Sequence, residues 1–152
     1  MIASLVDRLG IGHTELISIV GAGGKTTLLH GLGRDLASVG YRVVLTTTTR
    51  MAADQVTEPV CWSTIPDDVT AAHVHGTPLF VMSRLTPDKA VGPDPASVDR
   101  LFERSAADHV IVEADGARTM SIKSPADHEP MIPSRSTLVI VVVGADALGR
   151  SL

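Results

Sequence analysis

A glycine-rich segment near the start of the chain carries residue types that bind phosphate, in the order Gly21-Ala22-Gly23-Gly24-Lys25-Thr26-Thr27. Glycines allow backbone N–H groups to approach phosphate oxygens closely, and a helix that begins here adds the positive end of its dipole. Lys25 can then reach the β- and γ-phosphates of a nucleotide, and the Thr26 hydroxyl can ligate Mg²⁺. Residues 21–27 therefore predict a binding site for a nucleoside triphosphate with Mg²⁺.

The spacing within this segment differs from the commonest phosphate-binding loop. The pattern G-x-x-x-x-G-K-[ST] requires a glycine at position 19, where the chain has Ile19. The remaining G-x-x-G-K-T-T is a shorter loop that resembles the one in Mur ligases and their relatives. A dinucleotide-binding loop fits less well, because Thr26 stands where its third glycine belongs. A glycine-rich turn with a solvated lysine is the alternative to phosphate binding.

Two acidic residues, Glu113 and Asp115, end a second apolar run at residues 109–115. Side chains alternate along a strand, so these two carboxylates point the same way, toward the edge of the sheet where parallel strands end. Carboxylates suit Mg²⁺, and we expect Asp115 to hold the metal together with Thr26. We expect Lys25, Glu113 and Asp115 to supply the catalytic groups. A simple turn at Asp115 is the alternative.

Other polar residues are weaker candidates. The hydroxyls of residues 46–49, all threonines, could bind a substrate or metal-bound water, or could simply end a β-branched strand. The long connection at residues 116–133 contains Arg118 and Lys123, which could neutralise phosphate, and the pair His128 and Glu129, which could act on a substrate. A solvated surface position is the alternative for each of these four residues.

The residues between the motifs predict alternating strands and helices. Short β-branched runs at residues 15–20, 41–45, 109–115 and 138–143 indicate buried strands. A helix is predicted from Thr26 to about Gly40, because Leu28, Leu29, Leu32 and Leu36 share one face. A second helix follows Asp94, an N-cap before proline, and extends to about residue 106. Residues 51–92 give a weaker pattern, with one strand at residues 79–82.

The strand, helix, strand order predicts a mostly parallel sheet flanked by helices: a three-layer αβα architecture of the P-loop NTPase-like α/β class, formed by residues 1–152 as a single domain. Hydrophobic residues make up 44% of the 152 residues and aromatic ones only 3%, so the core must be aliphatic. A net charge of -4 argues against nucleic acid or an anionic membrane as a partner. Cys61 is the only cysteine, and no secretory signal or transmembrane run is recognisable, so we expect a cytoplasmic protein.

Five ordered segments resemble the YqeC family: V-G-A-G-G-K-T-T-L-L from Val20, L-T-T-T-T-R-M from Leu45, E-A-D-G-A from Glu113, I-K-S-P-A-D-H-E-P from Ile122 and V-G-A-D-A-L-G from Val143. Proteins of this family are described as accessory proteins of selenium-dependent hydroxylases. The resemblance implies a P-loop fold and a role in maturing a selenium-dependent molybdenum hydroxylase, with that enzyme or its cofactor precursor as a partner. Family members generally continue beyond the motif that ends here at Leu152, so we expect a fragment or a shortened member.

Three functions are compatible with these patterns: a nucleotide-hydrolysing maturation factor, a non-catalytic module that senses nucleotide, and a ligase-like or kinase-like domain that transfers a phosphoryl group. ATP is favoured over GTP as the nucleotide. The chain contains no asparagine and therefore lacks the Asn-Lys-x-Asp motif that commonly binds guanine, although Asp146 could accept hydrogen bonds from a guanine edge.

Overall fold

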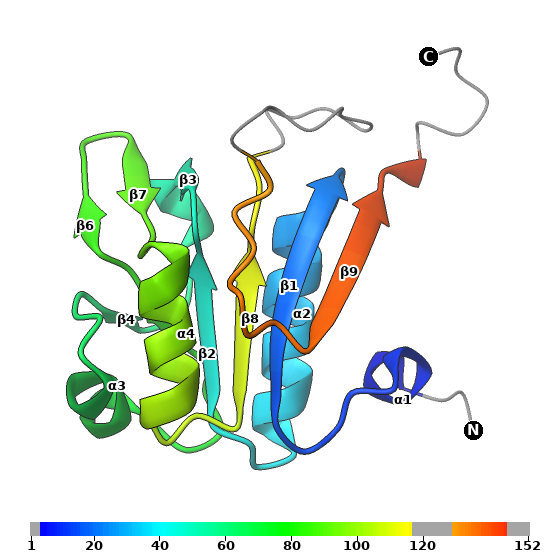
Figure 1. The fold of residues 1–152 in the computed structure, drawn as a ribbon, viewed down its shortest axis with the longest axis horizontal. Coiled ribbons are helices and arrows are strands. Elements are labelled where there is room, and N and C mark those ends of the chain that lie inside the picture. The colour runs from blue at the N-terminus through cyan, green and yellow to red at the C-terminus, as the bar shows by residue number, and fades with distance from the viewer. Residues whose placement is uncertain (1–3, 117–128, 146–152) are drawn as a thin grey trace.

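The computed structural model describes residues 4–116 and 129–145, and its central feature is a six-stranded sheet (Figure 1). Every neighbouring pair of strands in this sheet is parallel. The strands lie in the order β4 (Val60–Cys61), β5 (Leu79–Val81), β2 (Val43–Thr47), β8 (His109–Glu113), β1 (Glu15–Ala22) and β9 (Leu138–Val143). The predicted α/β class with a parallel sheet is therefore confirmed.

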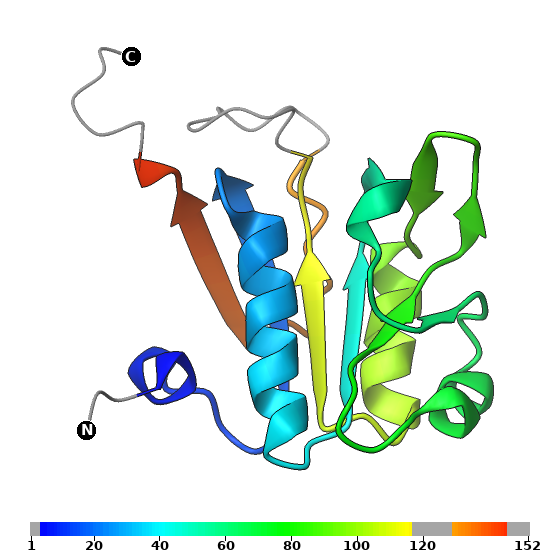
Figure 2. The same ribbon diagram turned by 180° about the vertical axis from the view of Figure 1, so that it is seen from behind.

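Helices cover both faces of the sheet and give the predicted three layers. Helix α2 (Lys25–Ser38) lies on one face and α4 (Pro95–Arg104) on the other, as Figure 2 shows from behind. Helix α3 (Pro66–Ala72) packs beside α4, with Val69 in the same buried cluster as Val98. The carboxylate of Asp94 accepts a hydrogen bond from the Ser97 amide at 2.9 Å, which confirms Asp94 as the N-cap of α4. A short helix, α1 (Leu5–Leu9), precedes the sheet.

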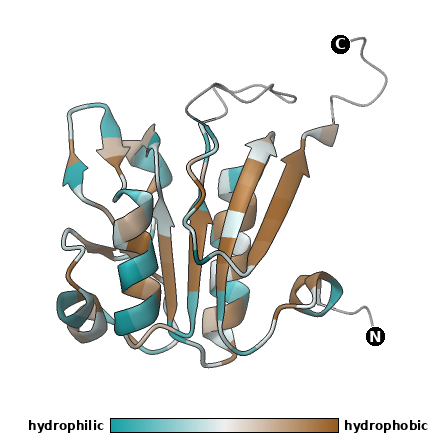
Figure 3. Cartoon of the chain, viewed as in Figure 1, coloured by the Kyte–Doolittle hydropathy of each residue, from teal (hydrophilic) through white to brown (hydrophobic). Residues whose placement is uncertain are grey.

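The core is aliphatic, and it divides between the two faces of the sheet according to strand alternation. Ile17 and Ile19 of β1 belong to the cluster that includes Leu29, Leu32 and Leu36 of α2. The neighbouring residues Leu16 and Val20 belong to a second cluster, with Val98 and Leu101 of α4. Figure 3 shows the apolar residues concentrated on the strands. The central strands thus bury both faces, which explains their continuous β-branched composition.

The last strand, β9, differs from the buried strand that its composition predicts. It lies at one edge of the sheet, and its exposure alternates along the chain. Leu138, Ile140 and Val142 pack against the core, whereas Val139, Val141 and Val143 are exposed. The apolar run at residues 138–143 therefore predicts correctly that this segment is a strand of the sheet, but it does not predict that the strand lies at the edge.

Residues 50–92 contain more structure than the sequence pattern predicts. A three-stranded antiparallel sheet forms from β3 (Arg50–Ala52), β7 (Lys89–Val91) and β6 (Arg84–Leu85), and a 3-10 helix, η1 (Ala53–Gln55), follows β3. Gly92 follows β7, at a point where a Cβ atom would lie only 1.5 Å from the carbonyl oxygen of Thr47. The small sheet therefore packs against the end of β2 through direct backbone contact.

The topology brings the carboxyl ends of β1 and β8 together at a point where the chain changes direction. From β1 the chain passes through α2 to β2, which lies beyond β8, and from β8 it passes to β9, which lies beyond β1. In open parallel sheets ligands bind at such a switch point. Both predicted functional segments end here (Figure 1). None of the helices that the structure describes is long and apolar enough to cross a membrane.

Candidate functional site

The glycine-rich loop is a tight connection in which only Gly23 and Gly24 separate β1 from α2. Gly21, Gly23 and Gly24 have φ angles of 96°, 76° and 94°, which residues with side chains rarely adopt. Gly21 is restricted further, because a Cβ atom there would lie 2.2 Å from the carbonyl oxygen of Val142 in β9. Strand pairing thus requires this glycine whether or not a phosphate binds.

Lys25 is buried rather than solvated, with 2% of its side chain exposed. Its ammonium donates to the carbonyl oxygen of Gly21 at 2.8 Å and lies 3.0 Å from Asp115 Oδ1 and 3.8 Å from Glu113 Oε1. Asp115 Oδ2 also accepts a hydrogen bond from the Gly21 amide at 2.9 Å. The structure therefore brings together the three residues predicted as catalytic groups, around one buried positive charge.

Thr26 and Glu113 form a second contact beside this cluster. The hydroxyl of Thr26 donates to Glu113 Oε2 at 2.8 Å, because β8 pairs with β1 in a register that sets Glu113 opposite Ile19. Burial raises the pKa of Glu113, the Thr26 hydroxyl and the charge of Lys25 oppose this rise, and the Asp115 carboxylate adds to it. The balance leaves the pKa above its ordinary value, so Glu113 holds a proton more readily than an exposed glutamate.

The donor set at this position fits Mg²⁺ in chemistry. The Thr26 hydroxyl and the carboxylates of Glu113 and Asp115 supply hard oxygen ligands, which Mg²⁺ prefers. Asp115 Oδ1 accepts no hydrogen bond within the described residues, and its partner there is the Lys25 ammonium. No group of three or more histidine, cysteine or acidic residues suited to a metal occurs in residues 4–116 and 129–145. A metal held here would complete its shell with water and phosphate oxygens.

The remaining loop residues lie to either side of this cluster. Ala22 is buried and pairs with Val143 at the end of β1. Thr27 follows Thr26 in the first turn of α2 and lines an open hollow beside that helix. All of the residues predicted to bind nucleotide therefore lie at one end of the sheet, within residues 21–27.

The hydroxyls of residues 46–49 are less available to a ligand than the sequence suggests. Strand β2 ends at Thr47 and does not continue through all four threonines. The hydroxyls of Thr46, Thr47 and Thr48 donate to the carbonyl oxygens of Val81, Glu113 and Met131. These hydroxyls therefore anchor β2 to its surroundings. Thr47 in particular ties β2 to the end of β8, beside the candidate site.

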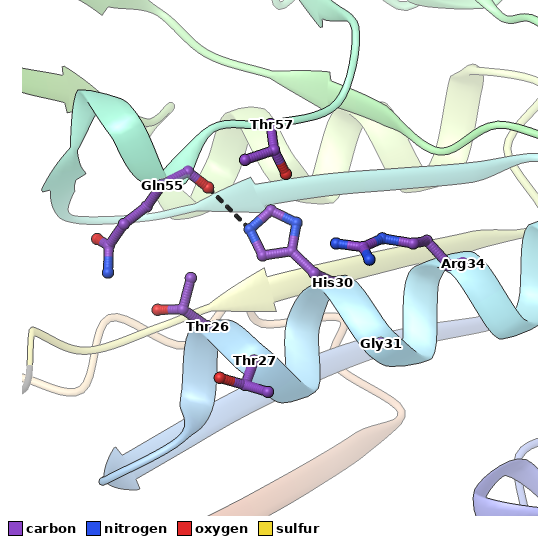
Figure 4. Close-up of a pocket in the computed structure, with 7 residues that line it drawn as sticks. All are labelled: Thr26, Thr27, His30, Gly31, Arg34, Gln55 and Thr57. Atoms are coloured by element: carbon purple, nitrogen blue, oxygen red, sulfur yellow. Dashed lines mark hydrogen bonds between the residues drawn. The ribbon is translucent and has the colours of Figure 1, made fainter.

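The sequence did not indicate a second polar cluster, which lies next to Thr26 and Thr27 (Figure 4). His30 Nδ1 lies 2.6 Å from Glu58 Oε2, and His30 Nε2 lies 2.8 Å from the Gln55 carbonyl oxygen. Arg34 Nε contacts Glu58 Oε1 at 3.2 Å. The spacing of Thr26, His30 and Arg34 on one helical face was visible in the sequence, but Glu58 falls in the weakly patterned middle segment.

The long connection after β8 is described only at its two ends. The amide of Gly116 donates to Glu129 Oε1 at 3.2 Å, so these ends lie together. Arg118, Lys123 and His128, which the sequence offered as phosphate or substrate contacts, lie outside the described residues, as does Asp146.

Fold and site together define an α/β protein in which a glycine-rich loop connects a strand of the parallel sheet to a helix that begins with a buried lysine. The family model for YqeC protein matches residues 17–152, so the chain belongs to the YqeC family. The chain is similar to the uncharacterized protein YqeC of Escherichia coli (strain K12), with 39% identity over 152 residues. That similarity covers 99% of this chain and 59% of the relative's length. No solved structure matches the chain.

Proposed function

We propose that this chain binds a nucleoside triphosphate with Mg²⁺ at residues 21–27. The observation that carries the proposal is the buried Lys25 ammonium, which lies 3.0 Å from Asp115 at the switch point of a parallel sheet. Burying an ammonium costs free energy that neighbouring carboxylates offset only in part, so a buried lysine is more readily explained where its charge has a functional use. Phosphate binding supplies one, because the same ammonium and the N-terminus of α2 face the same end of the sheet.

Each residue of the cluster has a part in the proposed site. Lys25 binds the β- and γ-phosphates, the backbone amides of Gly23 and Gly24 hold phosphate oxygens, and Thr26 with Asp115 holds Mg²⁺. When bound, Mg²⁺ supplies charge neutralisation for the phosphates. Glu113 lies within hydrogen-bond reach of Thr26, and its raised pKa suits it to hold or accept a proton.

We propose ATP as the preferred nucleotide and maturation of a selenium-dependent molybdenum hydroxylase as the role of the protein. The preference for ATP is supported by the absence of any asparagine for a guanine-binding motif. The role is supported by membership of the YqeC family alone. The client would be the hydroxylase or its cofactor precursor, and the natural location for this role is the cytoplasm.

Isothermal titration calorimetry with ATP, GTP and a slowly hydrolysed ATP analogue, each with and without Mg²⁺, tests the binding proposal. We expect Mg²⁺-dependent binding that Lys25→Met removes and that Lys89→Met, which alters an exposed lysine of β7, leaves within twofold. Equal affinity for ATP in the Lys25→Met protein, with a native circular dichroism spectrum, would refute the proposal. Phosphate release measured on the same samples separates a hydrolysing factor from a module that only senses nucleotide.

A further inference from the structure

A hollow of about 430 Å³ lies alongside the first turns of α2, next to Thr26 (Figure 4). One wall is formed by the face of α2 that carries Thr26, Thr27, His30 and Arg34, and the other by the segment that carries Gln55 and Thr57. Its volume is within the range of small-molecule sites, roughly 300–1,000 Å³. The surface of the hollow is mostly carbon, with polar groups at particular points.

Gly31 forms part of this hollow, and its presence in the middle of a helix requires an explanation. A glycine inside a helix is less favourable than alanine by about 0.5–1 kcal/mol, a cost that is normally accepted where a side chain would collide with something. Here a Cβ atom would meet nothing within 4 Å. A side chain at residue 31 would therefore project into the hollow, a space that no described part of the chain fills.

Among the residues that line the hollow, Arg34 carries a permanent positive charge, which it shares with the Glu58 carboxylate beside the hollow. Burial alone would raise the pKa of Glu58, but hydrogen bonds and charge from His30, with further hydrogen bonds from Thr57 and Arg34, lower it. Glu58 is therefore ionised and already partnered by His30 and Arg34. Arg34 keeps 62% of its side chain exposed, so its other guanidinium nitrogens can donate to a second oxyanion.

The length of the hollow fits a small organic molecule. Thr26 and Arg34 are eight residues apart on one helix, a rise of about 12 Å. A ligand whose acidic group contacts Arg34 and whose carbon body lies over Gly31 would extend toward the hydroxyls of Thr26 and Thr27. Its far end would then lie beside the proposed Mg²⁺ position.

We propose that this hollow binds a small organic oxyanion, a carboxylate or a phosphate ester, as a second ligand beside the nucleotide site. Its role as the molecule on which a bound nucleotide acts rests on the proposed function. Its binding does not, because every contact named for it lies on α2 and on the segment around Gln55. The two proposals can therefore fail separately.

Benzoate and phenyl phosphate serve as probes, with benzyl alcohol as the uncharged control, in titrations of the full chain followed by amide chemical shifts. We expect saturable shifts at the amides of Gly31 and Gln55 for both anions, and none for benzyl alcohol. Tighter binding of benzoate identifies a carboxylate as the preferred group, and tighter binding of phenyl phosphate identifies a phosphate ester.

Two pairs of variants test whether the anion binds in this hollow. Arg34→Gln should weaken anion binding at least fivefold, whereas Arg104→Gln, at an exposed position in α4, should change it less than twofold. Gly31→Leu should fill the hollow and abolish the saturable shifts, whereas Ser38→Leu, which adds the same side chain elsewhere on α2, should retain them. Unchanged binding in Arg34→Gln, or absence of saturable shifts in the unaltered chain, overturns the proposal. ATP binding measured on the same chain reports separately on the nucleotide site.

Discussion

Substitution of Lys25 by alanine tests how far the candidate site also stabilises the fold. The ammonium has 2% of its side chain exposed, and its two carboxylate neighbours, Glu113 and Asp115, have 11% and 9% exposed. Alanine would leave both carboxylates buried beside one another without a cation. Breaking a buried ion pair from one side costs about 3–5 kcal/mol, mainly because the remaining charge has no partner.

The loss should depend on pH, and the sign follows from Glu113. Its pKa is raised by burial and lowered in part by Thr26 and Lys25, so removing Lys25 raises it further in the folded protein. A raised pKa in the folded state contributes stability that is complete below the unfolded pKa and is lost as pH rises through the folded pKa. Lys25→Ala should therefore lose more stability at pH 8 than at pH 5.

Urea unfolding followed by circular dichroism at both pH values measures this effect. We expect a loss of about 3–5 kcal/mol at pH 8, which is a large share of the roughly 5–15 kcal/mol typical of a whole domain. Combining Lys25→Ala with Asp115→Asn should recover part of the loss, because fewer unpaired charges remain. Lys89→Ala on β7 is the control for loss of a lysine. A loss below about 1 kcal/mol at both pH values would refute the buried-charge reasoning.

Three further predictions concern stability, each measured by urea unfolding against the unaltered chain. Glu113→Gln should raise stability at pH 8 by about 1 kcal/mol, since it removes a buried carboxylate, and the gain should shrink as pH falls through the raised folded pKa and be absent below pH 4.5, where the unfolded carboxyl is also protonated. Gly31→Ala should stabilise by about 0.5–1 kcal/mol, whereas Gly92→Ala should cost at least about 3 kcal/mol, because its Cβ atom would collide with the backbone of Thr47. His109 is fully buried without a hydrogen-bond partner among the described residues, and burial lowers its pKa below 6.5, so the chain should lose stability as pH falls through that value. His109→Phe should reduce that loss and add roughly 1 kcal/mol at neutral pH, and an identical pH profile for variant and unaltered chain would contradict this account.

The fold could be predicted wherever a local pattern fixes the structure. Aliphatic runs located β1, β2, β5, β8 and β9 to within a few residues, and the periodic leucines located α2. Strands β3, β4, β6 and β7 are only two or three residues long, and their pairing depends on partners far along the chain. Such strands carry too few residues for alternation to be recognised, which is why the middle segment was missed.

The candidate site could be predicted in part, for the same physical reason. Alternation along the predicted strand at residues 109–115 set Glu113 and Asp115 on one side, and both carboxylates do lie beside Lys25, although β8 ends at Glu113 and Asp115 follows it. The burial of Lys25 was not predictable, because nothing in a glycine-rich loop indicates whether its lysine faces solvent. The contact between His30 and Glu58 joins a patterned helix to an unpatterned segment, so only the structure reveals it.

The contacts of the cluster also constrain how a ligand could enter it. The Lys25 ammonium donates a hydrogen bond to the Gly21 carbonyl oxygen and pairs with Asp115, and the Asp115 carboxylate accepts a hydrogen bond from the Gly21 amide. These contacts connect the end of β1 to the start of α2. If the Lys25 ammonium moves away from Asp115 to bind a phosphate, the buried Asp115 carboxylate loses its cationic partner. That carboxylate then needs another cation. Mg²⁺ meets this need only when the lysine has moved toward phosphate, since both cations beside one carboxylate would repel each other. At the proposed site, nucleotide and metal binding would therefore be coupled through Asp115, and each would strengthen the other.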